Sequence, residues 1–191
     1  MEPPENGCAD EYLFDPVILK QIDFSKHKAT YKPMISPANP GESLLLRPLC
    51  LGDFDRGFLQ LLSQLTKVGD ISRELFKERF TSMKSCPHTY YVTVLEDTRI
   101  NQVIGTATLF LEQKFIHTAA TRARIEDVVV SDDYRGKQLG KLLLDVLTLL
   151  SKKLGSYKVT LDCKDKMIPF YNTFGFTKEE GNNFLQQRFK D

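Results

Sequence analysis

From residue 42 onward, apolar residues recur with two different periods, and the period changes from segment to segment. Alternating or β-branched runs predict strands, and these lie at residues 42–49, 89–97, 103–116, 120–131, 157–163 and 183–191. Apolar residues three or four positions apart predict helices, and these lie at residues 53–66, 72–84, 139–155 and 165–176. Asp53 and Ser72 are the expected N-caps of the first two helices. The element order predicts a mixed α/β domain.

The first 42 residues differ in composition from the rest of the chain. Six of the nine prolines lie there, and proline at this density prevents long helices and sheet ladders. We therefore expect an N-terminal arm over residues 1–42 and a separate domain over residues 43–191. One helical turn is expected at residues 15–22, with Asp15 as its N-cap and Pro16 at its first helical position.

The composition is that of an ordinary globular chain, with 41% hydrophobic and 27% charged residues. A net charge of +1 argues against a nucleic acid or an anionic membrane as partner. The four cysteines are scattered, and the three histidines show no metal-ligand spacing. The acidic start does not resemble a signal peptide, and no apolar run reaches membrane-spanning length. We expect a cytoplasmic protein without a bound metal, although the sequence does not decide whether the arm visits a membrane surface.

The segment YRGKQLGK, residues 134–141, joins an apolar strand to the longest predicted helix. A helix N-terminus presents free N–H groups and a partial positive charge, which together bind anions. Two glycines leave room for an anion and three cations add charge; these are Gly136, Gly140, Arg135, Lys137 and Lys141. The spacing fits neither a Walker A loop nor GxGxxG. The alternative is a tight turn with solvated cations.

Three motifs occur in an order that is typical of one enzyme superfamily. The strand EDVVV (residues 126–130) precedes RGKQLG (residues 135–140), and FYNTFGF follows at residues 170–176. Together they resemble the GCN5-related N-acetyltransferase (GNAT) superfamily. The resemblance implies a central, mostly antiparallel sheet that is splayed at a bulge and flanked by helices. It also implies acetyl-CoA as co-substrate, held by Val128, Val129, Val130, Arg135, Gly136, Lys137, Gln138, Leu139, Gly140, Lys141 and Tyr171.

A closer resemblance is to the branch of this superfamily that acetylates the 2-amino group of glucosamine 6-phosphate in UDP-N-acetylglucosamine biosynthesis. The stretches that carry it are residues 65–69, 112–117, 124–143, 157–163, 169–176 and 187–190. The resemblance implies direct acyl transfer by a homodimer whose site lies at the interface. An acetyltransferase for a polyamine or a protein is the first alternative, and a non-catalytic acyl-CoA-binding module is the second.

The resemblance places three carboxylates, Glu126, Asp127 and Asp162, at the sugar and its amine. Consecutive residues of a regular strand point to opposite faces, so a bulge is needed to re-aim Glu126 or Asp127. Asp162 is expected at the end of a buried strand, where a carboxylate needs a partner. The alternative is an exposed, salt-bridged or otherwise satisfied carboxylate. The group that deprotonates the amine stays open.

The sugar phosphate is assigned, again by resemblance, to Thr66, Lys114, His117 and Arg188. A planar guanidinium binds two phosphate oxygens, and the resemblance implies that Arg188 reaches the site from the partner subunit. Solvent-exposed charge is the alternative for Lys114 and Arg188. A structural or exposed position is the alternative for His117.

Tyr171 resembles the superfamily tyrosine that stabilises or protonates the departing thiolate, and a strand N–H would polarise the thioester carbonyl. The alternative for Tyr171 is core packing. Cys163 is a poor nucleophile, because it is expected in an apolar strand without a nearby base. Met167 stands where the family usually has asparagine. Methionine cannot donate the same hydrogen bond, so we expect rearranged coenzyme contacts there.

Overall fold

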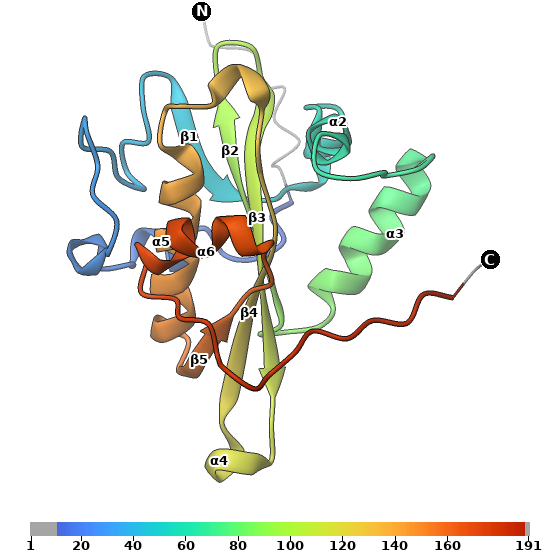
Figure 1. Cartoon of the computed structure of the whole chain (residues 1–191). Helices are drawn as coiled ribbons and strands as arrows, with labels where there is room; N and C mark the ends of the chain where they lie inside the picture. The colour runs from blue at the N-terminus through green and yellow to red at the C-terminus, as the bar shows by residue number, and fades with distance from the viewer. Residues whose placement is uncertain (1–10, 190–191) are drawn as a thin grey trace, which may run out of the picture.

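A computed structural model of the chain describes residues 11–189 (Figure 1). Its sheet has five strands in the order β1-β2-β3-β4-β5. The strands are β1 (Leu44–Pro48), β2 (Tyr90–Asp97), β3 (Gln102–Gln113), β4 (Thr121–Val130) and β5 (Ser156–Thr160). The first four strands pair antiparallel, and β5 runs parallel to β4 after a helical crossover. The predicted mixed α/β class with a mostly antiparallel sheet is confirmed.

Helices cover both faces of this sheet. The helical elements are α1 (Val17–Lys20), η1 (Phe24–Lys26), η2 (Leu51–Phe54), α2 (Phe58–Ser63), α3 (Arg73–Lys84), α4 (Ile116–Ala119), η3 (Asp132–Tyr134), α5 (Leu139–Lys153), η4 (Asp165–Met167) and α6 (Ile168–Asn172). In Figure 1, α5 and α6 lie on one side of the sheet, and α2 and α3 lie on the other. Because both faces are covered, β2 is buried along nearly its whole length.

The crossover helix α5 supplies most of the core on its side. It buries Leu139, Leu142, Leu143, Leu144, Val146, Leu147 and Leu150. Full burial of one such side chain is worth roughly 1.5–3 kcal/mol, so this face fixes the helix firmly against the sheet. Gly155 follows the last turn with φ 80°, as the sequence predicts for a helix end. The position of the N-terminus of α5 is therefore set by packing along the whole helix.

Much of the segment before β1 lies against α5. Leu19, Ala29, Tyr31 and Ile35 belong to the same buried cluster as the leucines of that helix. The predicted turn is present as α1, but Pro16 is its N-cap and not its first helical residue. The first ten residues of the predicted arm lie outside the described part of the chain. The division of the chain at residue 42 stays a prediction.

The predicted N-cap role of Asp53 is wrong, whereas that of Ser72 is confirmed. The Asp53 carboxylate is fully buried and accepts hydrogen bonds from Arg47 Nη1 and Nη2 at 2.8 and 2.7 Å. The helix expected over residues 53–66 is therefore divided into η2 and α2, and Gly57, with φ 79°, precedes α2. Ser72 Oγ accepts from the N–H of Leu75 at 3.1 Å and caps α3.

The C-terminal part differs most from its prediction. β5 ends at Thr160, so Asp162 and Cys163 lie beyond the strand, and both are exposed rather than buried. Residues 183–189 form no strand within the described chain, and residues 190 and 191 lie outside it. Phe184, Leu185 and Phe189 are 66%, 88% and 84% exposed. In Figure 1 this tail extends away from the sheet, where it has no neighbouring strand to complete a ladder.

Candidate active site

The sheet opens between β4 and β5. β5 pairs only with residues Thr121–Arg124 of β4. Beyond Arg124, the N–H and C=O groups on that edge of β4 take no partner from β5. An exposed strand edge of this kind binds an extended ligand through main-chain hydrogen bonds. The opening therefore offers the Val128–Val130 segment to a chain-like molecule.

A bulge on β4 accompanies this opening. Glu126 pairs with Thr108 and Val129 pairs with Thr106, so two residues of β4 face one residue of β3 between these pairs. Asp127 is one of the two, and its φ of 52° is left-handed. An extra residue in one strand re-aims the neighbouring side chains. The predicted bulge at the acidic pair is confirmed.

The segment that follows β4 turns into α5 through two left-handed residues. Gly136 has φ 81°, and Gln138, the N-cap of α5, has φ 63°. A Cβ at Gly136 would meet nothing within 4 Å, so glycine serves the backbone conformation there and not the packing. Alternating handedness at a helix start directs successive N–H groups into one concavity, which suits an anion.

A cleft of about 620 Å³ lies at this helix start and reaches the open edge of β4. It is lined by every residue that the sequence assigns to the coenzyme except Lys137. Lys137 instead places its Nζ over the ring of Tyr134, 4.6 Å from the ring centre. The lining also includes Met167, where the sequence predicted a changed coenzyme contact, and side chains that were not assigned to the coenzyme, namely Gln64, Leu65, Tyr134, Leu144 and Phe170. One continuous cleft thus joins the anion-binding loop, the strand edge and Tyr171.

Two of the three predicted carboxylates are joined by a residue that the sequence did not single out. Arg124 Nε donates to Glu126 Oε1 at 2.5 Å, and Arg124 Nη2 donates to Asp162 Oδ2. The side chains of Glu126 and Asp162 are 47% and 44% exposed, whereas that of Arg124 is 23% exposed. Asp162 is therefore satisfied by an ion pair at the surface, and the expectation of burial is wrong. Its pairing with a residue 38 positions away left no local signal.

Asp127 has a different environment from the other two carboxylates. Asp127 is exposed like the other two, but partial desolvation by its neighbours raises its pKa, and repulsion from the Glu126 carboxylate adds to this effect. A carboxylate with a raised pKa takes up a proton more readily than a solvated one does. The site therefore combines one carboxyl suited to proton exchange with two that are held by Arg124.

Tyr171 borders the cleft on the α6 side, next to Met167 and Phe170. Its ring packs edge-to-face with that of Phe170 at 5.2 Å. Partial burial raises the pKa of the Tyr171 hydroxyl, with the nearby Cys163 as a second cause. The hydroxyl is therefore protonated at neutral pH and can donate a hydrogen bond into the cleft.

Cys163 is exposed and lies outside the strand in which the sequence placed it. The pKa of its thiol is nevertheless raised, first by partial desolvation and then by Asp165 and Asp162. A protonated thiol is a weak nucleophile. Cys163 is therefore still expected to be a poor nucleophile, but because its pKa is raised and not because it is buried in an apolar strand.

The four residues expected at the phosphate are not gathered within one chain. Lys114 Nζ lies 2.5 Å from Glu112 Oε2 at the end of β3. His117 lies at the tip of the β3–β4 hairpin, where its ring is 4.9 Å from that of Tyr157. Arg188 lies on the exposed tail. Thr66 follows α2 and is exposed.

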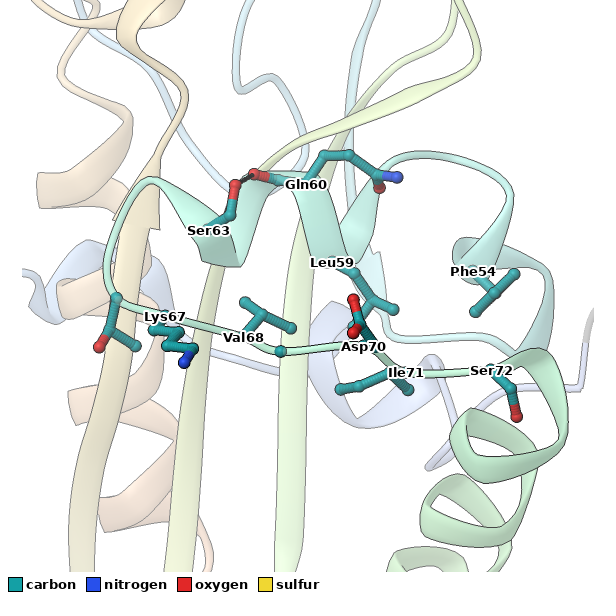
Figure 2. Close-up of a pocket in the computed structure, with 11 residues that line it drawn as sticks. Phe54, Leu59, Gln60, Ser63, Lys67, Val68, Asp70, Ile71 and Ser72 are labelled. Atoms are coloured by element: carbon teal, nitrogen blue, oxygen red, sulfur yellow. Dashed lines mark hydrogen bonds between the residues drawn. The ribbon is translucent and has the colours of Figure 1, made fainter.

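Thr66 borders a second cleft of about 820 Å³, which Figure 2 shows between α2 and the start of α3. Leu59, Val68 and Ile71 form an apolar part of its lining, and Lys67 and Asp70 add opposite charges. Gln64 and Leu65, just before Thr66, line the first cleft. The connection between α2 and α3 therefore separates the two clefts.

Among residues 11–189, no group of three or more His, Cys, Asp or Glu side chains could hold a metal ion. In the same range, every helix is too short or too polar to cross a membrane.

Comparison with known proteins gives the class of this site. Residues 58–176 match the acetyltransferase (GNAT) family. The chain therefore belongs to the GNAT family of acetyltransferases, as the loop and the splayed sheet indicate.

Within that family, three relatives carry the name of one activity. A probable glucosamine 6-phosphate N-acetyltransferase of Drosophila melanogaster is 54% identical over 175 residues, which cover 91% of this chain and 80% of that protein. Glucosamine 6-phosphate N-acetyltransferase 1 of Dictyostelium discoideum is 36% identical over 72% of this chain and 87% of its own length. The crystal structure of the Arabidopsis thaliana glucosamine-6-phosphate N-acetyltransferase superposes with a TM-score of 0.72 at 32% identity, covering 78% of this chain and 99% of that one.

Proposed function

We propose that this chain transfers the acetyl group of acetyl-CoA to the 2-amino group of D-glucosamine 6-phosphate. The products are N-acetylglucosamine 6-phosphate and CoA, and the former is a precursor for UDP-N-acetylglucosamine biosynthesis. The observation that carries the proposal is the cleft that joins the N-terminus of α5, the open edge of β4 and Tyr171. The 54% sequence identity to a Drosophila melanogaster relative named for this activity supports the choice of substrate.

Different parts of the cleft would bind different parts of the thioester. N–H groups at Gly136 and at the first turn of α5 would hold the diphosphate, with Arg135 and Lys141 supplying charge. The open edge of β4 at Val128–Val130 would bond the pantetheine amides as an added strand does. A strand N–H there would also polarise the thioester carbonyl. Met167, in place of the usual asparagine, contributes an apolar contact to this arm.

The reaction forms a C–N bond and breaks a C–S bond, and one proton must move from the amine to the sulfur. Glu126, Asp127 and Asp162 would orient the ammonium group, and Arg124 fixes two of these carboxylates. Asp127, with its raised pKa, is suited to accept the amine proton directly or through water. Tyr171 would donate its hydroxyl proton, or a hydrogen bond, to the departing sulfur.

We also propose that the phosphate half of the site is completed in a homodimer. The exposed apolar side chains of residues 184–189 support this, since a tail of this kind gains stability by packing on another chain. Arg188 would then reach the phosphate bound by the partner subunit, near Lys114, His117 and Thr66. The free thiols of Cys86 and Cys163 fit a reducing compartment, and we place the reaction in the cytoplasm.

A substrate panel tests the activity. Thiol release from acetyl-CoA is measured with glucosamine 6-phosphate, glucosamine, spermidine and a lysine peptide. We expect turnover that is fastest with the phosphosugar. Absence of turnover with glucosamine 6-phosphate, or faster turnover with spermidine or the peptide, would contradict the proposal.

Mixed dimers test the composite site. Activity is measured at a glucosamine 6-phosphate concentration near the wild-type KM, where Arg188→Ala and Asp162→Ala chains are each expected to be nearly inactive alone. Random exchange gives half mixed dimers with one intact site each, so about one quarter of the wild-type activity should return. No recovery in dimers shown by mass to be mixed would place both residues in one subunit.

A further inference from the structure

Three polar side chains form a line along one face of α5. Gln138, Lys141 and Asp145 stand at positions i, i+3 and i+7, which lie above one another on a helix. Residues 28–33 of the N-terminal segment cover this line, and we call these residues the strap. Their contacts run in the opposite direction to the helix, from Asp145 at residue 28 to Gln138 at residue 33.

The strap is anchored at Asp145, which is only 1% exposed. The Asp145 carboxylate accepts from the N–H groups of Lys28 and Ala29, both at 3.1 Å, and from the hydroxyl of Tyr31 at 2.8 Å. A buried carboxylate is strongly destabilising without such donors. The anchor therefore specifies where the strap lies and is independent of any ligand.

At its other end the strap holds Gln138, the N-cap of α5. Gln138 Oε1 accepts from the N–H of Lys32 at 2.8 Å, and Gln138 Nε2 donates to the carbonyl of Pro33 at 2.9 Å. Lys141 Nζ also donates to the carbonyl of Thr30 at 3.4 Å. Both polar atoms of the Gln138 amide are thus engaged by the strap. Gln138 has φ 63°, a conformation that a residue with a Cβ keeps only when its surroundings enforce it.

We infer that the strap is a positioning element for the diphosphate-binding loop. By fixing Gln138 in its left-handed conformation, it aims the N–H groups of the following turn into the cleft. The inference rests on the proposed function, because it takes the diphosphate of a nucleotide thioester as the ligand of that turn. Gln138 and Tyr31 act through the backbone of the loop and are positioning residues.

The test compares two thioesters in the full-length protein. Acetyl-CoA carries the diphosphate, whereas S-acetylpantetheine ends before it and depends on the β4 edge alone. Gln138→Met keeps the length of the side chain but removes both hydrogen bonds to the strap, and Tyr31→Phe loosens the anchor from the strap side. For Gln138→Met we expect the KM for acetyl-CoA to rise about three- to tenfold, and for Tyr31→Phe about twofold.

The remaining parameters separate positioning from general damage. We expect kcat with acetyl-CoA, kcat/KM with S-acetylpantetheine and the KM for glucosamine 6-phosphate to stay at wild-type values in both variants. Calorimetric titration with CoA should show the same loss of affinity without turnover. Gln60→Met, an exposed glutamine beside the other cleft, and Tyr12→Phe, away from Asp145, are the matched controls.

Two results would contradict the inference that the strap positions the loop. Equal losses with both thioesters would mean a general effect on the fold. A loss with Gln138→Met but none with Tyr31→Phe would mean that the Gln138 side chain contacts the coenzyme directly. Wild-type protein that fails to bind CoA would instead contradict the proposed function, so the two failures are distinguishable.

Discussion

The two halves of the candidate site are built in different ways. The cleft proposed for the coenzyme lies within one chain and joins the start of α5, the edge of β4 and Tyr171. The phosphate half is dispersed over the β3–β4 hairpin tip, the segment after α2 and the exposed tail. The first half is fixed by the core, whereas the second depends on segments with few buried contacts.

This difference has a functional consequence. A preformed coenzyme cleft binds its ligand with little ordering cost, whereas a dispersed phosphate site must be assembled by the partner subunit, the substrate or both. Changes in the cleft should therefore alter the kinetics of acetyl-CoA within each subunit. Changes in the phosphate set should alter the kinetics of the amino sugar and act across subunits. Four substitutions test this division.

The largest effect is expected from Tyr171→Phe. This change keeps the ring packing against Phe170 but removes the proton donor, so kcat should fall about 10²–10⁴-fold with little change in either KM. Because the pKa of Tyr171 is raised above 10.0, the wild-type kcat should fall on the alkaline side only above pH 10, if deprotonation of Tyr171 governs that limb. Tyr157→Phe, at an exposed tyrosine, is the control. A fall in kcat of less than tenfold would mean that Tyr171 is not the proton donor.

Arg188→Ala should give the next largest effect. Loss of a charge-assisted contact to the phosphate should raise the KM for glucosamine 6-phosphate up to about 100-fold. The KM for acetyl-CoA should not change, because Arg188 lies outside the coenzyme cleft. Arg73→Ala, which removes an exposed arginine paired with Asp55 at the start of α3, is the control. An equal rise in both KM values would contradict the division.

Gly136→Val should raise the KM for acetyl-CoA about tenfold, since a β-branched residue is strained at φ 81° and forces the loop to rearrange. The KM for the sugar should not change. Gly155→Val is the matched control, because its φ is 80° and a Cβ there also meets nothing within 4 Å. Both variants should lose similar thermal stability. Only the first should lose coenzyme affinity, and equal kinetics in both would exclude the loop from the coenzyme site.

Asp127→Asn should give the smallest effect on stability, a rise in Tm of about 1–3 °C at pH 7. Loss of the proposed proton acceptor should separately lower kcat by about 10²-fold. The folded state raises the pKa of Asp127, so its ionised form destabilises the fold at neutral pH. This penalty is present above the folded pKa and disappears as the pH falls below the unfolded value. The gain in Tm should therefore vanish below about pH 4. A gain that persists there would be due to the preference of asparagine for left-handed φ.

Local patterns predicted the elements on which the coenzyme half depends. The leucine spacing of α5, the Ser72 cap and the β2–β3–β4 antiparallel strands follow from residues close in sequence, and all are present. The acidic pair required a bulge, and the structure has one. Much of the cleft is predictable because its strand edge and its loop are consecutive in the chain from β4 to α5, whereas Gln64 and Leu65 reach it from a distant segment.

Non-local contacts account for the failures. Asp53 has the sequence signal of an N-cap, but its carboxylate binds the buried Arg47 guanidinium and the N–H of Cys50, so Asp53 lies inside η2 and not before a helix. The sequence did not indicate a role for Arg124, because its partner Asp162 is 38 positions away. The tail at residues 183–189 has the composition of a strand, but a strand also needs an edge to pair with. Such partners are specified by the folded chain or by a second subunit, not by local periodicity.

The most direct test of the account is a crystal structure with CoA and glucosamine 6-phosphate bound. The account predicts the diphosphate on the N–H groups between Gly136 and Lys141, the sulfur beside the Tyr171 hydroxyl, and the sugar amine among Glu126, Asp127 and Asp162. A diphosphate bound elsewhere, or a sulfur remote from Tyr171 and those carboxylates, would contradict it.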